Sequence, residues 1–184
     1  MKKYLLIPFF AAALLSVGTT ATYAQNTVMV GGAAMYPTKD IVDNAVNSKD
    51  HTTLVAAVKA AGLVETLKSA GPFTVFAPTN AAFNLLPDGT VANLLKPENK
   101  KQLTSVLTYH VVAGSMDSKM LMDKVKEGGG KAMLTTVQGE QLTVWQKGKK
   151  LMVKDTKGNS AMVTIKDVYQ KNGVIHVVDK VLMP

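Results

Sequence analysis

The 184-residue chain contains no cysteine and no arginine, and each absence excludes a class of protein. Without cysteine, neither a disulfide framework nor a thiolate metal site can form, so the fold has to be stable through packing alone. Without arginine, the chain lacks the planar guanidinium that nucleic-acid-binding proteins use for bidentate and stacking contacts. All 21 basic residues are therefore lysines, and we expect no nucleic-acid partner.

Long hydrophobic runs are also scarce, and the longest lies at residues 5–17. This run follows Lys2 and Lys3 and precedes a small-residue sequence that ends at Ala24, which is the arrangement of a secretory signal peptide. The run is too short to span a bilayer. We predict that residues 1–24 are cleaved and that the mature protein, without a membrane span, is periplasmic or extracellular.

The charge of the mature chain is strongly positive. Loss of Lys2 and Lys3 leaves 19 lysines against 13 acidic residues, a formal charge of +6. Scattered lysines are typical of an ordinary solvated surface, and they also attract acidic polysaccharides, lipid headgroups or cell envelopes weakly. The candidate partner is therefore an acidic polysaccharide or protein.

Hydrophobic periodicity divides the chain into an arm, a helical half and a strand-rich half. Residues 25–37 show no periodicity and are interpreted as a flexible arm. Apolar residues then recur at helical spacing in successive segments. The predicted helices cover residues 40–46, 54–61, 63–69, 91–96, 97–108 and 118–126.

The last third of the chain changes to a period of two, which is typical of half-buried strands. Strands are predicted at residues 142–147, 151–154, 161–166, 168–169 and 174–178. Asn172 and Gly173 between the last two form the usual sequence of a type I′ hairpin turn. Helices followed by hairpins indicate one α+β domain over residues 38–184.

Residues 71–83 combine a helix break, a strand and a helix start within a short stretch. Phe73 begins a run of aromatic and β-branched residues that favours a strand. Thr79 or Asn80 is expected to cap a following helix, which would bury Phe83. We interpret this stretch as a folding nucleus and not as a catalytic loop.

The three histidines are the candidate reactive residues, but no nucleophile, phosphate-binding or zinc motif surrounds them. His51 is expected to lie at a helix start near the surface, and His176 is expected to be half-buried in a strand. His110 follows Tyr109 at a helix-to-strand junction, where an imidazole can bond free backbone groups. No second ligand stands at metal-like spacing, so we expect no catalytic residue, metal or cofactor. An enzyme that uses His110 or His176 remains a further hypothesis.

Two further patterns leave alternatives open. Trp145 is followed by three lysines and is either a sugar-stacking platform or a residue that packs across strands. A group of methionines is either a copper(I) site or flexible core filling. The lysines are Lys147, Lys149 and Lys150, and the methionines are Met116, Met120 and Met122.

Three segments of the chain resemble signature motifs of the fasciclin domain, a module of secreted and surface-anchored adhesion proteins. Residues 71–83 resemble the first block, and residues 172–182, which include Gly173 and His176, resemble the second. Tyr109 and His110 resemble the tyrosine–histidine motif between the blocks. The motifs occur in the family's order, although Ala81 stands where the family often has an acidic residue.

The resemblance implies a β-wedge of two sheets with helices packed along it. It also implies attachment to a cell surface or matrix instead of catalysis. In animal relatives, an Asp-Ile pair before the second block has been linked to integrin recognition, and Asp167 and Val168 occupy the matching positions here. The alternative for this pair is that Asp167 only ends a strand.

Two further expectations concern binding by the whole domain. A single domain cannot cross-link surfaces alone, so avidity would require weak self-association or many copies. The alternative to adhesion is a carrier of a small ligand or lipid, which would use a cleft between the helices and the wedge.

Overall fold

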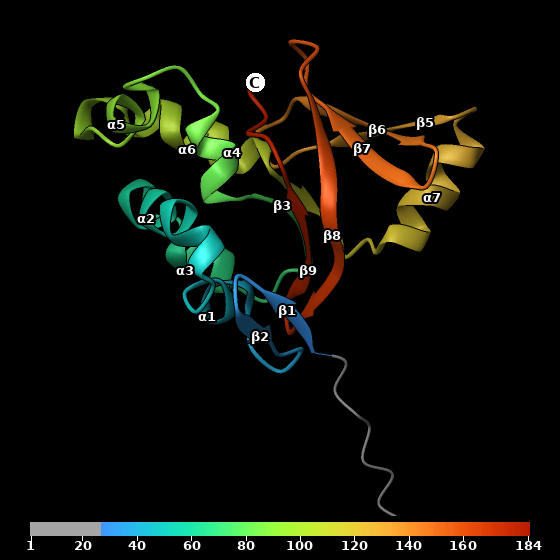
Figure 1. Cartoon of the computed structure of the whole chain (residues 1–184), viewed down its shortest axis with the longest axis horizontal. Coiled ribbons are helices and arrows are strands. Elements are labelled where there is room, and N and C mark those ends of the chain that lie inside the picture. Colours follow the sequence, from blue (N-terminus) through green and yellow to red (C-terminus); the bar gives the residue numbers. More distant parts are fainter. Residues whose placement is uncertain (1–26) are drawn as a thin grey trace, which may run out of the picture.

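A mixed seven-stranded sheet in the order β4-β3-β9-β8-β7-β6-β5 organises the molecule (Figure 1). The computed structural model describes residues 27–184, so the predicted signal peptide lies outside the described residues. A bridge between Val112 and Thr136 links the two edges of the sheet, which is therefore nearly closed. The strands are β3 (Phe73–Pro78), β4 (Val111–Ala113), β5 (Lys131–Thr135), β6 (Gln141–Lys147), β7 (Lys150–Lys154), β8 (Ser160–Gln170) and β9 (Gly173–Val178).

The helices lie in two groups on either side of this sheet. The first six lie on the side of β3 and β9, while α7 lies against β5 and β6 (Figure 1). The α-helices are α1 (Ile41–Ala45), α2 (Thr52–Ala61), α3 (Val64–Lys68), α4 (Asn80–Asn84), α5 (Thr90–Leu94), α6 (Lys100–Tyr109) and α7 (Ser118–Glu127). Two 3₁₀ turns, Lys49–His51 and Pro97–Asn99, precede α2 and α6. The predicted α+β wedge is confirmed.

Strand β8 gives the sheet its wedge shape because it is shared between two layers. Its first residues pair with β7, from Ser160 to Met162, and its later residues pair with β9, from Val163 to Gln170. The register shifts twice between Val163 and Val168, which bends the strand between the layers. The two strands predicted at residues 161–166 and 168–169 are therefore one continuous strand.

The two signature blocks lie side by side at the centre of the molecule. β3 and β9 pair in parallel, from Phe73 opposite Gly173 to Pro78 opposite Val178. Both strands are buried along nearly their whole length, as expected for central strands with layers on each face. The hairpins predicted from the sequence are antiparallel, so this parallel pair is a feature that only the tertiary structure reveals.

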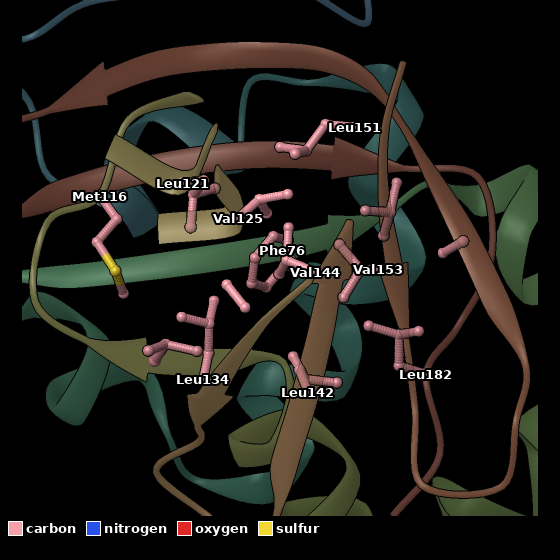
Figure 2. Close-up of a cluster of buried hydrophobic side chains, with 14 of the residues drawn as sticks. Phe76, Met116, Leu121, Val125, Leu134, Leu142, Val144, Leu151, Val153 and Leu182 are labelled. Atoms are coloured by element: carbon pink, nitrogen blue, oxygen red, sulfur yellow. The ribbon is translucent and has the colours of Figure 1, made fainter. Parts of the chain in front are cut away.

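Successive residues of β3 point to opposite faces and contribute to two different cores. Phe76 joins the core under β6, β7 and α7, which Figure 2 shows as side chains converging from these elements. Val75 joins the core on the other face, together with Ile41 of α1 and Ile175 of β9. Because both cores share β3, the helical and strand-rich halves are held as one unit.

Residues 25–37, predicted to be a flexible arm, instead contain a hairpin. β1 (Val28–Val30) pairs with β2 (Ala33–Met35), and Val30 and Met35 are buried in the core that contains Val75. Gly31 and Gly32 connect the strands with φ values of +57° and +77°, the two positive angles that a type I′ turn requires. The strands are too short for their period to be recognised in the sequence.

The turn before β9 also differs from its prediction. Gln170 pairs with Gly173, so the turn residues are Lys171 and Asn172 instead of Asn172 and Gly173. Gly173 lies within β9 without a positive φ, and a Cβ there would overlap the carbonyl oxygen of Phe73. The glycine is therefore required for close strand approach, not for turn conformation.

Candidate functional site

Asp167 joins strand β8 to the start of helix α7. Its φ of +60° lies in the left-handed region, which aspartate tolerates better than most residues. One carboxylate oxygen accepts a bond from the Ser118 backbone N–H at 2.5 Å, and the other accepts from the Ser118 hydroxyl at 2.6 Å. Ser118 is the first residue of α7, where a negative charge is favourable. The carboxylate is thus engaged inside the protein.

Val168, the second member of the candidate recognition pair, is only 1% exposed and packs in the core with Val75. The neighbouring Tyr169 is 42% exposed, and its hydroxyl donates to Asp117 at 3.3 Å. Asp167 does not end a strand, as the alternative interpretation expected, because β8 continues past it to Gln170. The pair that matches the animal Asp-Ile motif therefore presents one engaged carboxylate and one buried aliphatic side chain.

His176 fixes the loop that leads into α7. Its Nε2 lies 2.9 Å from the Met116 carbonyl, and its Nδ1 faces the Asp167 N–H at 3.4 Å. This pattern assigns the proton to Nε2. Burial lowers the pKa of His176, so the ring is neutral. The sequence predicted a half-buried residue, whereas His176 is fully buried and stacks on Phe76, because layers cover both faces of β9.

Tyr109 and His110 connect the end of α6 to the strand-rich half. The Tyr109 hydroxyl donates to the Gln141 carbonyl at 3.0 Å and accepts from the Thr156 N–H at 3.1 Å. His110 Nδ1 lies 2.8 Å from the Val106 carbonyl, and Nε2 accepts from the Leu182 N–H at 3.0 Å. Burial lowers the pKa of His110 to about 4. Both ring nitrogens are therefore bonded to backbone groups, and the imidazole is neutral.

The residues of the first signature block hold α4 against its neighbours. The Thr79 hydroxyl accepts from the Ala82 N–H at 3.2 Å and caps the helix. Asn80 instead links α4 to α2, because its amide oxygen accepts from the Thr53 N–H at 3.0 Å. Phe83 is buried in a small core beside Val106, and Phe73 begins β3 opposite Gly173.

Asn172, predicted from the sequence only as a turn residue, bonds backbone groups of two helices. Its amide oxygen accepts from the Ile41 N–H at 3.1 Å. Its amide nitrogen donates to the carbonyls of Leu67 and Ser69 at 2.7 and 2.8 Å. One buried side chain thereby satisfies backbone groups at the start of α1 and at the end of α3, and no local pattern in the sequence indicates this.

His51 was predicted to lie near the surface. It is instead buried beside an apolar cavity. The residue is 3% exposed, and Nδ1 lies 2.9 Å from the Ser48 hydroxyl. Burial lowers the pKa of the ring, and the nearby Ala77 carbonyl, which opposes this shift, does not reach Nε2 with hydrogen-bond geometry. The cavity measures about 80 Å³ and lies between α1–α3 and the central strands. Its lining includes Leu54, Val58 and Ile175.

The described residues contain no cluster that could hold a metal. Within residues 27–184, no three histidines or acids come close enough to ligate one ion. Met116 is buried in the core, whereas Met120 is 47% exposed, so these two methionines face different surroundings. Over the same residues, no helix combines the length and hydropathy needed to cross a bilayer.

The family assignment follows from comparison with known sequences. Residues 49–184 match the Fasciclin domain family. The chain is 46% identical to Protein sll1483 of Synechocystis sp. over 160 residues, which cover 87% of this chain and 82% of that protein. It is 40% identical to Immunogenic protein MPB70 of Mycobacterium bovis over 145 residues, or 76% and 66% of the two chains.

Longer relatives contain the same domain as a part. The chain is 36% identical to transforming growth factor-beta-induced protein ig-h3 of Sus scrofa over 151 residues, which cover 80% of this chain but 20% of that protein. A FAS1 domain pair from the insect cell adhesion molecule Fasciclin I matches with a TM-score of 0.72. That match covers 81% of this chain and 52% of the other chain. Because the two sequences are only 18% identical, the match shows the fold alone. The paired signature blocks, the matched residues and the similar relatives together show that this chain belongs to the fasciclin domain family.

Proposed function

We propose that this chain is an exported, non-enzymatic attachment domain that binds an acidic component of a cell surface or extracellular matrix. Fasciclin domains occur in cell adhesion proteins, of which insect Fasciclin I is one. Membership alone does not name a partner, so the chemistry of the partner is inferred from the surface of this chain.

The observation that carries the proposal is the excess of lysines without an ion-pair partner over acidic side chains without an internal contact, among the residues that the structure describes. Seven of the nine aspartates accept an internal hydrogen bond or form an ion pair. Among residues 27–184, by contrast, only Lys68, Lys119 and Lys126 form ion pairs. The remaining lysines are available to a polyanion, and their summed field attracts one.

The arrangement of the two central histidines supports a binding role over catalysis. A general acid or base needs a ring nitrogen within reach of a substrate proton. In His110 and His176, both ring nitrogens face backbone groups inside the protein. Replacement of either histidine should therefore lower the stability of the fold and should abolish no enzymatic activity.

The proposal is tested by retention of the mature protein, residues 25–184, on immobilised acidic and neutral polysaccharides. We expect retention on the acidic matrix at low ionic strength and release when the salt concentration rises several-fold, because surface charges are screened. The neutral matrix is the control. Equal retention on both, or retention that ignores salt, would contradict the proposal.

A second candidate function, an apolar-ligand carrier, is favoured by the cavity beside His51. Its lining is almost entirely apolar, and the unpartnered His51 Nε2 could bond one polar group of a ligand. Native mass spectrometry of the purified protein tests this candidate. An apolar molecule bound at near-unit stoichiometry supports the carrier. A bare protein mass, before and after incubation with a small aromatic alcohol that fits the cavity, counts against it.

A further inference from the structure

The outer face of strands β5–β8 presents the single tryptophan of the chain within a ring of lysines. Trp145 is partly exposed on this face, while the alternating residues Val144 and Leu142 point into the core. Four exposed lysines share the outward side of the strands: Lys131, Lys147, Lys150 and Lys154. Helix α7 packs on the opposite side, against the core residues (Figure 1).

The strand register places these groups around the indole. Lys131 lies directly opposite Trp145 on β5, and Met152 lies opposite it on β7. Lys154 lies opposite Thr143, one pleat further along the same face. From strand spacing and rise, the Cα atoms of Lys131 and Lys154 are roughly 12 Å apart, with Trp145 and Thr143 between them.

An open groove of about 570 Å³ follows this arrangement. Its side-chain lining consists of Trp145, Met133, two hydroxyl residues and two lysines. The hydroxyl residues are Thr143 and Ser160, and the lysines are Lys131 and Lys154. No acidic residue lines the groove.

A second observation on the same face points to an anionic partner. Lys147 and Lys150 lie directly opposite each other across the β6–β7 hairpin. Like charges in this position destabilise a hairpin. Neither lysine has an ion-pair partner among residues 27–184. A bound polyanion would remove the repulsion, so the hairpin itself should gain stability on binding.

We propose that this face binds a polysaccharide whose sugar rings carry carboxylates, with one ring stacked on the Trp145 indole. The indole contacts the apolar face of the ring, as aromatic residues do at surfaces that are part apolar and part wet. The lysines pair with carboxylates on both sides, and the hydroxyls of Thr143 and Ser160 bond sugar hydroxyls. The inference rests on the proposed function and assigns its partner class and its site.

The shape and chemistry of the face favour a polysaccharide over a lipid surface. Trp145 lies within strand β6 and is partly buried, so its indole does not project freely from the surface as a residue that anchors in the acyl region of a bilayer does. Binding of anionic vesicles through this face would therefore overturn the proposal.

The test uses Trp145 as its own reporter, because every change in tryptophan emission arises at this position. The mature protein is titrated with an oligogalacturonate, and maltohexaose and phosphatidylglycerol vesicles serve as separate arms. We expect the emission of Trp145 to change saturably with the oligogalacturonate only, and the affinity to fall as salt is added. No change in emission with the oligogalacturonate, or a change in emission with the vesicles, would overturn the assignment.

Variants separate the site from the general charge of the surface. Affinity electrophoresis in gels that contain polygalacturonate should show about tenfold weaker binding for Trp145→Ala and for the Lys131→Gln/Lys154→Gln pair. Trp145→Phe, which keeps an aromatic face, should bind nearly as well as the original chain. The matched control is Lys96→Gln/Lys101→Gln, which removes the same charge from exposed positions in the helical half. Thermal melts of each variant check that the fold is kept.

The outcomes distinguish the two proposals. If the original chain binds polygalacturonate and the two double lysine variants weaken binding equally, the proposed function stands and the assignment of this site is wrong. If the original chain binds no acidic polysaccharide, both proposals fail.

Discussion

At the residue scale, single side chains join elements that are distant in the sequence. Asp167 secures the start of α7 through Ser118, and Asn172 secures α1 and α3. In each case one polar side chain satisfies backbone groups that would otherwise be left unpaired inside the protein. Substitution at these positions should therefore lower stability more than substitution at a surface position does.

Replacement of Asp167 by alanine should lower the free energy of unfolding by about 2–4 kcal/mol. Two charge-assisted bonds to Ser118 are lost, and alanine tolerates the left-handed backbone less well. Urea denaturation measures the change, and Ser118→Ala, which removes one bond, should cost less. If Asp167→Ala keeps full stability but loses attachment to cells, then Asp167 is a recognition residue and this structural interpretation is wrong.

Replacement of Gly173 by alanine should be more costly than a glycine substitution in an open turn. The new Cβ would meet the Phe73 backbone and separate β9 from β3, at a cost of about 2–4 kcal/mol. Gly148→Ala is the control, because a Cβ at Gly148 meets no neighbouring atom and the only cost is the positive φ, about 1–2 kcal/mol. Equal losses in thermal unfolding for the two variants would refute the close-approach argument.

At the element scale, the N-terminal hairpin completes a core that the rest of the domain leaves open. Val30 and Met35 pack with Ile41 and Ile175, and the Lys49 N–H donates to the Gly31 carbonyl at 3.1 Å. The hairpin therefore belongs to the folded unit, although the family match begins at residue 49.

A shortened chain that begins at Thr38 should be less stable than one that begins at residue 27. Two buried side chains contribute about 1.5–3 kcal/mol each, so the loss should be about 3 kcal/mol or more. Guanidinium denaturation of the two chains measures the difference. Equal midpoints would mean that the hairpin is a dispensable arm, as its sequence suggested.

At the scale of the whole molecule, the three histidines should make stability depend on pH. Burial lowers the pKa of His51, His110 and His176 in the folded protein, whereas the unfolded chain binds protons near the ordinary value of about 6.5. The unfolded state therefore takes up more protons as the pH falls. Stability should be complete above about pH 6.5 and decrease towards pH 4.

For His110 alone, the lowering of the pKa to about 4 corresponds to a loss of about 3 kcal/mol in the free energy of unfolding across this pH range. Denaturant titrations at several pH values measure the slope. His110→Gln should reduce the slope by about one proton, whatever its effect on absolute stability. A slope that is unchanged in this variant would show that His110 does not titrate as its burial indicates.

Local patterns predicted much of this fold because they act over a few residues. The helix at Ser118–Glu127, the hairpin of β6 and β7 and the cap at Thr79 follow from periodicity and side-chain chemistry at adjacent positions. The motif likeness predicted the wedge and the family. The hairpin at residues 28–35 was missed because three residues per strand carry too little periodic signal.

The sequence alone determined the helical and strand-rich halves, the lysine-only charge and the family, because these depend on neighbours along the chain. Only the tertiary structure decided that β3 and β9 pair in parallel, that Val168 is buried, and that Lys131 and Lys154 flank Trp145. Strand pairing joins residues that are far apart in the chain, and one step in register moves every side chain to the other face. The environment of Trp145 therefore depends on register, which no local pattern specifies.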